Sequence, residues 1–539
     1  MPDGLHGFTN APIEVELGPS ETEPDAVFAG PDGREWTVPA YLTGGGTWRA
    51  RFAAPEPGVY TYRIAGTTKT AGTVEIKPYE GDNALYRHGR LRVAASRRTL
   101  EHSDGTPFLW LGDTWWMGLT TRLDWPDGFA LLTRDRAEKG FNLIQLVAGP
   151  LPDFDSETAS FHPQQANEAG WPWEHGWARI NPCFYDLADR RIAHLVESGL
   201  VPCIVGMWGY YLLAMGFENV KRHWRNLVAR YGAYPVVWCA AGEVTMPTYS
   251  HHGSAKAQDE RKTLSEQWTQ VMRYIREIDP YHNLLTVHPA GGMASRDSLT
   301  DESVLDLDML QTGHGGYWSL GPTIEKETAA VARKPRMPVV NGEVCYENIM
   351  GGSQQEVQRF LFWTSLTSGT AGHTYGAHGI WAMSSRNEPF QGTTGSWGDG
   401  FWQDVMHLPG SAQVGVGKRL LERYSWWLFE PRHEPEVEKA GRVSAFAAGI
   451  PGTVWLFYLA ATCMEPRFFG VQGMRIAIEP GARYRAVFLN PRTGAETEVG
   501  LVAPDADGRW PVPAKPTMED WVLVLEQVDG ASPRPRAGR

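Results

Sequence analysis

Between residues 92 and 430, short apolar runs alternate with stretches that have a helical pattern. Eight runs have the length of strands and lie at residues 107–113, 141–148, 201–207, 235–243, 283–289, 307–313, 337–343 and 369–376. They are apolar with little alternation, which is typical of strands buried on both faces. In one intervening stretch Val220, Trp224, Leu227, Val228 and Tyr231 repeat at helical spacing. This alternation predicts an α/β fold, a (β/α)8 TIM barrel. A doubly wound sheet is the alternative, but no Gly-rich phosphate loop follows any run.

The two ends of the chain have a different pattern. Residues 12–88 contain short runs separated by Gly, Pro, Asn and Asp, and residues 47–52 and 59–64 alternate apolar and polar side chains. Alternation of period two predicts half-buried antiparallel strands. Residues 432–528 return to this pattern. We therefore expect two small β-sandwiches around the barrel, with domains at residues 1–90, 91–430 and 431–530, and a disordered tail at 531–539.

Composition narrows the classes of function. The 539 residues carry 62 acidic and 50 basic groups, a net charge of −12, which argues against a nucleic-acid partner. Aromatic residues make up 12% of the chain, including 23 Trp, so most of the chain is not disordered. Many Trp residues indicate either large cores or surfaces on which sugars stack. Ten of them follow predicted strands or lie in the long loop after the second strand: Trp115, Trp116, Trp171, Trp173, Trp177, Trp208, Trp318, Trp381, Trp397 and Trp402. We therefore expect the Trp excess to form the wall of a sugar pocket and not merely a large core.

The cysteines and the N-terminus indicate the compartment. The five Cys are odd in number and widely spaced, which is typical of reduced thiols. The first residues do not have the pattern of a signal peptide. We therefore expect a cytoplasmic protein. Residues 198–217 carry no charge, but they contain four Gly and a Pro and have no basic flank, so we expect a buried strand and a loop here, not a membrane span.

Two carboxylates occupy equivalent positions. Glu243 ends the fourth predicted strand and Glu343 ends the seventh, and a Gly precedes each. Catalytic groups of barrels sit at the C-terminal ends of strands, and strands four and seven lie nearly opposite each other. Glycoside hydrolysis requires two such carboxylates. Either Glu alone could equally form a structural ion pair, but both at matching strand ends favour chemistry.

These residues carry a resemblance to a known family. The segment from Asp104 to Gln145, with DGTPFLWLGDTWW and FNLIQ, resembles the start of the catalytic domain of apiosidase-like glycoside hydrolases. The two Gly-Glu pairs resemble the catalytic positions of that family, within the wider clan of retaining barrel glycosidases. The flanking segments resemble sandwiches often found beside such barrels. The resemblance implies a retaining glycoside hydrolase in which Glu343 is the nucleophile and Glu243 the acid/base.

The sequence departs from these patterns in two places. The apiosidase pattern has Asp where this chain has Glu243, and the wider clan has Asn where this chain has Gly242. The residue that would bind a substrate 2-hydroxyl is therefore absent or supplied from elsewhere. The reaction type stands, but apiose cannot be assigned as the sugar.

Further polar and aromatic residues lie within or after the predicted strands. Such side chains suit a wet pocket with stacking walls, although each one alone could be a satisfied core group. The candidates for substrate binding are Asp113, Trp115, Trp116, Asn142, Gln145, Trp208, His288, Gln311, His314, Tyr375, His378 and Trp381.

Two other functions remain open from the sequence. The histidines could belong to a metal-dependent barrel hydrolase, but the first strand has no His and the pair His251-His252 has poor geometry for joint ligation. A non-catalytic carbohydrate-binding protein is the second alternative. We expect a small glycoside or oligosaccharide as substrate, no cofactor or metal, no nucleic-acid or membrane partner, and a homo-oligomer as one possible assembly.

Overall fold

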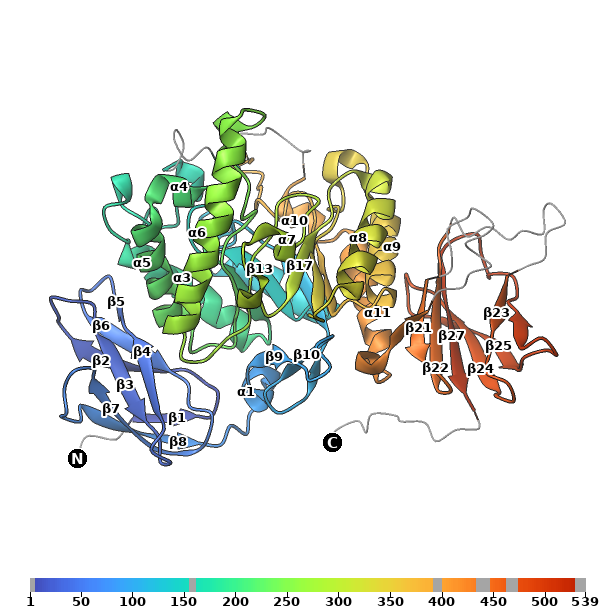
Figure 1. The fold of residues 1–539 in the computed structure, drawn as a ribbon, viewed down its shortest axis with the longest axis horizontal. Helices are drawn as coiled ribbons and strands as arrows, with labels where there is room; N and C mark the ends of the chain where they lie inside the picture. Colours follow the sequence, from blue (N-terminus) through green and yellow to red (C-terminus); the bar gives the residue numbers. More distant parts are fainter. Residues whose placement is uncertain (1–4, 155–160, 391–399, 433–445, 462–473, 529–539) are drawn as a thin grey trace.

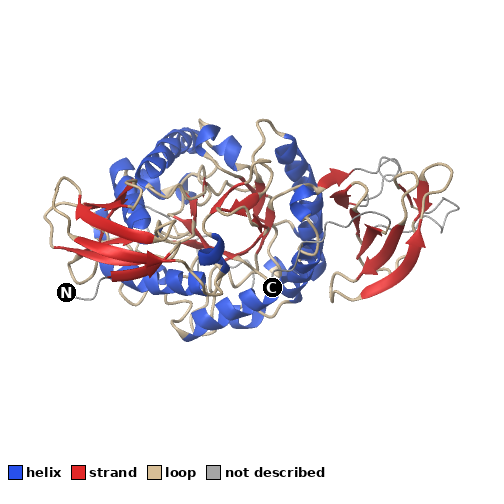
Figure 2. Cartoon of the chain, turned by 90° about the horizontal axis from the view of Figure 1, so that it is seen from below, coloured by secondary structure: helices blue, strands red, loops and turns tan. Residues whose placement is uncertain are grey.

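The computed structural model describes residues 5–154, 161–390, 400–432, 446–461 and 474–528. A central barrel lies between two smaller β-domains (Figure 1). Seen from below, the helices surround the barrel strands, and strands of the two smaller domains lie at either end (Figure 2). The predicted fold class is confirmed.

The barrel is an eight-stranded sheet in the order β16-β15-β14-β13-β12-β19-β18-β17, and all of its pairs are parallel. Its strands are β12 Trp110–Thr114, β13 Leu143–Val147, β14 Val201–Val205, β15 Val237–Cys239, β16 Leu285–Thr286, β17 Asp308–Gln311, β18 Val339–Glu343 and β19 Gly372–Tyr375. Every residue of these strands is buried, which explains the continuous apolar runs. The first predicted run, residues 107–113, is split in the structure. Pro107–Phe108 form β11, which pairs antiparallel with β10 outside the barrel, and the barrel strand β12 begins at Trp110.

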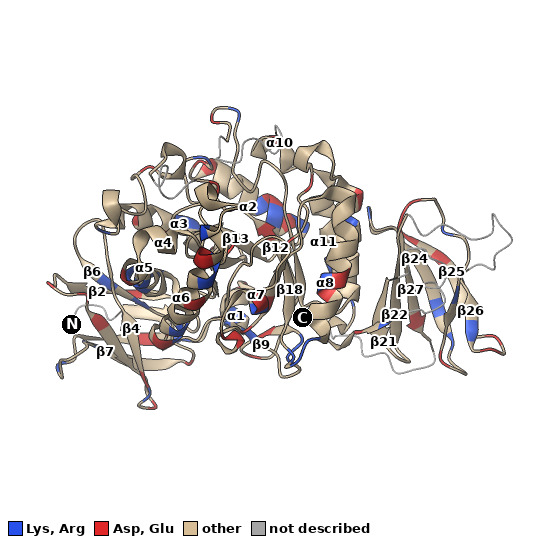
Figure 3. Ribbon diagram, turned by 45° about the horizontal axis from the view of Figure 1, so that its top comes forward, with Lys and Arg blue, Asp and Glu red and all other residues tan. Residues whose placement is uncertain are grey.

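Helices cover the barrel from outside. The helices in and beside the barrel are α1 Ala84–His88, α2 Asp127–Lys139, α3 Pro182–Glu197, α4 Tyr211–Met215, α5 Phe217–Tyr231, α6 Lys256–Ile278, α7 Ser295–Ser298, α8 Leu320–Ala332, α9 Gln355–Thr367, α10 Trp402–Val405 and α11 Pro409–Leu421. Val220, Trp224 and Leu227 of α5 are buried against the strands, as their spacing predicts. Charged residues lie along the outer helices α6 and α8 (Figure 3). Among the described residues no helix is long and apolar enough to cross a membrane, and residues 198–217 contain β14 and α4.

The N-terminal domain has two facing sheets around one core. The five-stranded sheet has the order β1-β8-β7-β3-β4 and the three-stranded sheet the order β2-β6-β5. Their strands are β1 Leu5–Phe8, β2 Ile13–Gly18, β3 Asp25–Ala29, β4 Glu35–Pro39, β5 Tyr41–Leu42, β6 Trp48–Phe52, β7 Gly58–Ile64 and β8 Gly72–Lys77. The pairing is antiparallel except that β1 runs parallel to β8. A small antiparallel sheet of β9 Leu91–Val93, β10 Leu100–His102 and β11 leads to the barrel.

The C-terminal domain is a six-stranded antiparallel sheet with a two-stranded sheet beside it. Its strands are β20 Glu430–Arg432, β21 Phe446–Ile450, β22 Val454–Leu459, β23 Arg475–Ala477, β24 Tyr484–Leu489, β25 Glu496–Val502, β26 Arg509–Pro511 and β27 Trp521–Gln527. Arg359 of α9 donates to both oxygens of Asp520, at 2.7 and 2.8 Å, and so ties this domain to the barrel. The predicted tail at 531–539 lies outside the described residues.

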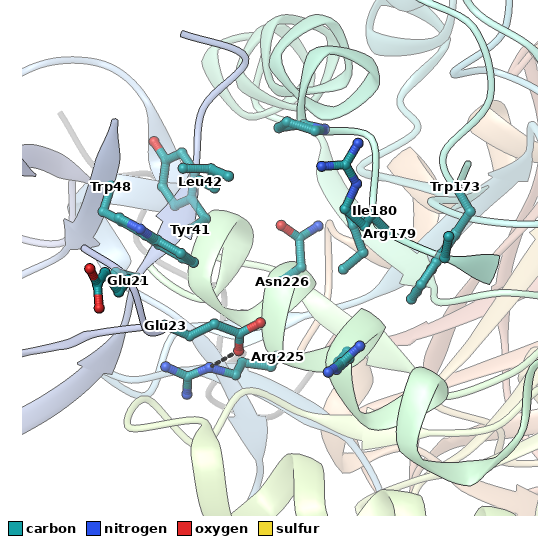
Figure 4. A pocket seen from close by; sticks show the side chains of 14 residues that line it. Glu21, Glu23, Tyr41, Leu42, Trp48, Trp173, Arg179, Ile180, Arg225 and Asn226 are labelled. Atoms are coloured by element: carbon teal, nitrogen blue, oxygen red, sulfur yellow. Dashed lines mark hydrogen bonds and ion pairs between the residues drawn. The ribbon is translucent and has the colours of Figure 1, made fainter. Parts of the chain in front are cut away.

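Charged side chains join the N-terminal domain to the barrel. Asp189 of α3 accepts from Arg51 of β6 at 2.7 Å and from Arg230 of α5 at 2.9 Å. All three groups are largely buried. Burial raises the pKa of Asp189, but the two guanidinium groups lower it overall. Nearby, the same interface encloses a cavity of about 280 Å³, with Trp48 on one side, Asn226 on the other and the Glu23–Arg225 ion pair at its edge (Figure 4).

We expect the Asp189→Ala variant to lose about 3–5 kcal/mol of unfolding free energy, because two buried guanidinium groups lose their shared carboxylate. Denaturant unfolding at pH 7 measures the change. The control is Glu35→Ala, which removes the partner of Arg63 in a largely exposed pair at 3.0 Å and should cost less than about 1 kcal/mol. Equal effects of the two changes would contradict a special role for the buried network.

Candidate active site

Glu343 is the last residue of β18, and its side chain reaches the C-terminal mouth of the barrel with only 4% of its surface exposed. Two imidazoles and one amide surround it. His314 Nε2 lies 2.7 Å from Oε1, His288 Nε2 lies 3.2 Å from Oε2, and Gln311 Nε2 donates to Oε1 at 3.1 Å. Burial raises the pKa of Glu343, but His288 and His314 more than offset this and hold it well below its usual range. Glu343 is therefore ionised at neutral pH.

Glu243 lies in the turn after β15, where the backbone departs from regular strand geometry. Gly242 pairs with Trp208 in an isolated bridge, and Glu243 has a φ of +38°, a value that non-glycine residues rarely adopt. Its carboxylate accepts from Gln311 at 3.1 Å and from Trp208 Nε1 at 3.4 Å. Burial and the Glu343 charge raise the pKa of Glu243. Strained backbone of this kind clusters at functional sites.

The two carboxylates share one amide donor and differ in protonation. Gln311 Nε2 lies 3.1 Å from an oxygen of each, so those two oxygens cannot be farther apart than twice that distance. One carboxyl has a raised pKa and the other a lowered pKa. Environments that push two pKa values apart in this way assign one group as an acid and the other as a base or nucleophile.

A cavity of about 260 Å³ opens above the pair. Aromatic side chains from several loops form its walls. The cavity is lined by Trp116, Pro152, Asp153, Trp208, Glu243, Met246, Tyr249, His252, Gln311, His314, Glu343, Tyr346, Ile349 and Trp381. A concave site with aromatic walls and a few convergent polar groups is what a small-molecule site requires.

Comparison with known proteins identifies the family. A family model described as "Apiosidase-like, catalytic domain" matches residues 94–428, more than half of the chain. The chain belongs to the apiosidase-like family. A second model, described as a domain of unknown function (DUF5060), matches residues 8–66. A search of curated protein sequences gave no match.

Solved structures share the fold of this apiosidase-like protein. A putative glycoside hydrolase from Bacteroides vulgatus ATCC 8482 is similar over 97% of this chain and 100% of its own, with a TM-score of 0.70 and 17% identity. A glycoside hydrolase family 5 structure from the same organism covers 82% of this chain and 93% of its own, with a TM-score of 0.64 and 22% identity. The suspected family is confirmed, and the protein is a glycoside hydrolase.

The structure brings most of the predicted site residues of the apiosidase-like domain together. Trp116, Trp208, Gln311, His314 and Trp381 line the cavity with both Glu residues. His288 lies below them and touches Glu343. His378 stands behind Trp381, whose Nε1 lies 3.4 Å from His378 Nδ1.

Other predicted residues lie away from the cavity. Asp113 is fully buried, receives a hydrogen bond of 2.6 Å from Arg136 of α2 and another of 2.8 Å from Trp115, and so belongs to an internal ion pair. Asn142 and Gln145 bond to backbone within the barrel wall. Tyr375 donates to Glu347 at 2.5 Å. Hydrogen bonds inside the barrel therefore replace the expected sugar contacts at these positions.

The Trp residues divide in the same way. Three of the ten line the cavity, namely Trp116, Trp208 and Trp381. Trp115, Trp173 and Trp402 are buried, Trp171 and Trp177 are half-buried, Trp318 is exposed, and Trp397 lies outside the described residues. The expectation that the Trp excess is mainly pocket wall is therefore too broad, because much of it is core.

Several residues of the cavity are not among those predicted from the sequence. Asp153, Met246, Tyr249 and His252 lie in the loops after β13 and β15, and Tyr346 and Ile349 lie after β18. They lie beyond the strand ends, so the pattern of apolar runs did not select them. Tyr346 carried the clearest signal, since it follows Glu343 by only three residues. Burial and the Glu343 carboxylate raise its pKa well above the usual value, so the phenol stays protonated.

The departure at Gly242 has a steric explanation. A Cβ atom placed on Gly242 would lie 2.2 Å from the Trp208 ring. The tryptophan therefore fills the space that the asparagine of the wider clan would need. Among the described residues, no group of three or more His, Cys, Asp or Glu side chains is arranged to hold a metal ion.

His314 supplies a positive charge beside Glu343. Burial lowers the pKa of His314, but the Cys345 thiol and the Glu343 carboxylate raise it to about 10 overall. We expect the His314→Gln variant to raise the pKa of Glu343, because a positive charge 2.7 Å away is lost. The acidic limb of the kcat/KM pH profile should move to higher pH. His252→Gln changes another cavity histidine and is the control, and equal profiles for all three proteins would contradict this effect.

Proposed function

We propose that this glycoside hydrolase is a retaining enzyme in which Glu343 is the nucleophile and Glu243 the acid/base. One observation carries the proposal, namely the Gln311 amide shared between the two carboxylates at 3.1 Å each. The limit applies to the two oxygens that the amide bonds, and such a close pair is compatible with the roughly 5–5.5 Å between the carboxyl groups of retaining enzymes.

In the first step an ionised Glu343 oxygen attacks the anomeric carbon while Glu243 gives its proton to the glycosidic oxygen. The bond to the leaving group breaks, and a glycosyl ester forms on Glu343. In the second step Glu243, now ionised, takes a proton from water, whose oxygen attacks the anomeric carbon and releases Glu343. The lowered pKa of Glu343 and the raised pKa of Glu243 support these roles.

The surrounding residues support both steps. His288 and His314 hold the Glu343 carboxylate and favour its ionised form. Gln311 orients both carboxylates. Trp116, Trp208 and Trp381 offer faces and edges to the apolar sides of a sugar ring and exclude water from the reacting atoms.

The size of the cavity supports a terminal sugar of a small glycoside or oligosaccharide as the substrate. Its volume of about 260 Å³ is below the range of about 300–1,000 Å³ usual for drug-sized ligands. A cytoplasmic location remains a prediction that rests on the number and spacing of the cysteines.

The anomeric configuration of the first product tests the mechanism. A panel of aryl glycosides (apioside, arabinosides, xyloside, fucoside, glucoside and galactoside) identifies a substrate. Proton NMR during the first minutes of its hydrolysis should show a product with the same anomeric configuration as the substrate. An inverted first product would overturn the proposal.

A further inference from the structure

Asp153 is a buried carboxylate on the wall of the cavity that holds Glu243 and Glu343. It lies in the loop after β13 and is only 4% exposed. Its φ of +66° is in the left-handed region, which Asp tolerates better than most residues. The backbone therefore adopts an uncommon conformation where it places Asp153 on the cavity wall.

Contacts from the loop after β14 hold the chain on both sides of Asp153. The backbone N–H of Trp208 donates to Pro150 at 3.0 Å, and Tyr210 Oη donates to the Phe154 carbonyl at 2.6 Å. The rings of Tyr210 and Tyr249 meet edge to face at 5.5 Å. Burial and the nearby Asp153 charge raise the pKa of Tyr249 well above its usual value. Tyr249 therefore stays protonated and neutral beside Asp153.

The charges on the cavity wall limit what can bind there. The described lining contains three carboxylates and two histidines, and it contains no Lys or Arg. An ionised carboxylate only accepts hydrogen bonds, so its ligand must supply donors. The hydroxyl groups of a neutral sugar are such donors. An anionic group of a carboxylated or sulfated sugar would be repelled beside Asp153, because the cationic His314 of this wall is already paired with Glu343.

The cavity has room for about one sugar ring. That ring must lie against Glu343 and Glu243 in order to react. We propose that Asp153 is a specificity-determining residue, which accepts hydrogen bonds from hydroxyls of the neutral sugar ring that is cleaved. This inference rests on the proposed function and extends it to the class of sugar.

The test compares the 4-nitrophenyl glycoside hydrolysed fastest in the panel with analogues that lack one ring hydroxyl each. The proteins are the wild type, Asp153→Asn, Asp153→Ala and the control Asp127→Asn, which changes an exposed carboxylate of α2. Asp153→Ala should lower kcat/KM for the parent substrate about 10- to 100-fold, the size expected of hydrogen bonds to a charged group, and Asp153→Asn should lower it less.

Non-additive losses of kcat/KM distinguish a direct hydrogen bond from Asp153 to the sugar from a merely structural role of Asp153. For the deoxy analogue that lacks the contacted hydroxyl, the wild type should lose the same factor, and Asp153→Ala should lose little more. Additive losses at every ring position, or an unchanged kcat/KM in Asp153→Ala, would overturn the inference. The anomeric configuration of the product is followed in the same assays. A retained product from Asp153→Ala shows that the double displacement works, so a negative result then concerns Asp153 alone. An inverted product from the wild type would instead remove the proposed function.

Discussion

The Glu343→Ala variant is expected to lose about 10⁴-fold or more in kcat, because no other described carboxylate on the cavity wall is held ionised beside two imidazoles. The loss should not depend on the leaving group, since no glycosyl ester can form. Steady-state assays with the best aryl glycoside of the panel measure it. The Glu356→Ala variant, in the exposed contact with Tyr317, is the control and should behave like the wild type.

Azide should restore turnover in Glu343→Ala. The small anion can enter the space left by the carboxylate and attack the anomeric carbon from the same face, while Glu243 still protonates the leaving group. The product is then a glycosyl azide with inverted configuration, which NMR identifies. Glu343→Gln tests for steric effects, because its amide fills the space and should resist rescue. Activity within about tenfold of the wild type in Glu343→Ala would contradict the assignment.

The Glu243→Ala variant is expected to lose about 10²- to 10⁴-fold in kcat/KM on glycosides with poor leaving groups, the usual contribution of a general acid. Dinitrophenyl glycosides should lose far less, because their leaving group needs no proton. Azide should again increase the rate, but now by attacking the glycosyl ester on Glu343, so this product keeps the configuration of the substrate. The two azide products therefore distinguish the roles of the two residues.

The same variant tests the raised pKa of Glu243. The acid must be protonated, so wild-type activity should fall as pH rises through that pKa. In Glu243→Ala this basic limb should disappear for good leaving groups. Glu243→Gln, of similar shape but without a titrating proton, is the matched control. A basic limb that persists in both variants would show that another group causes it.

Ionisation of the pair depends on groups from several strands. Glu343 comes from β18, Gln311 from β17, and Trp208 from the loop after β14. Each side chain lies at or just after the end of a buried strand, and the parallel strands end at the same mouth of the barrel. A change that shifts any of these strands should therefore affect the protonation of both carboxylates.

The sequence alone predicted the architecture well because the relevant signals are local. Continuous apolar runs mark strands buried on both faces, and stripes such as Val220, Trp224 and Leu227 mark helix faces. It also selected Glu243 and Glu343, since a carboxylate after an apolar run must end at a mouth or find a partner. The same rule selected Asp113, but that carboxylate lies in an internal ion pair and not at the cavity.

Only the tertiary structure decided which polar strand-end residues face the cavity. Asp113 pairs with Arg136, 23 positions later on α2, and no local sequence pattern predicts that contact. Asp153 reaches the cavity because Trp208 and Tyr210 hold its loop from another strand. The periodicity of a chain records which face of an element is buried, so it determines the fold. The partners of a polar side chain depend on elements distant in sequence, so only packing decided which of the candidate residues face the cavity.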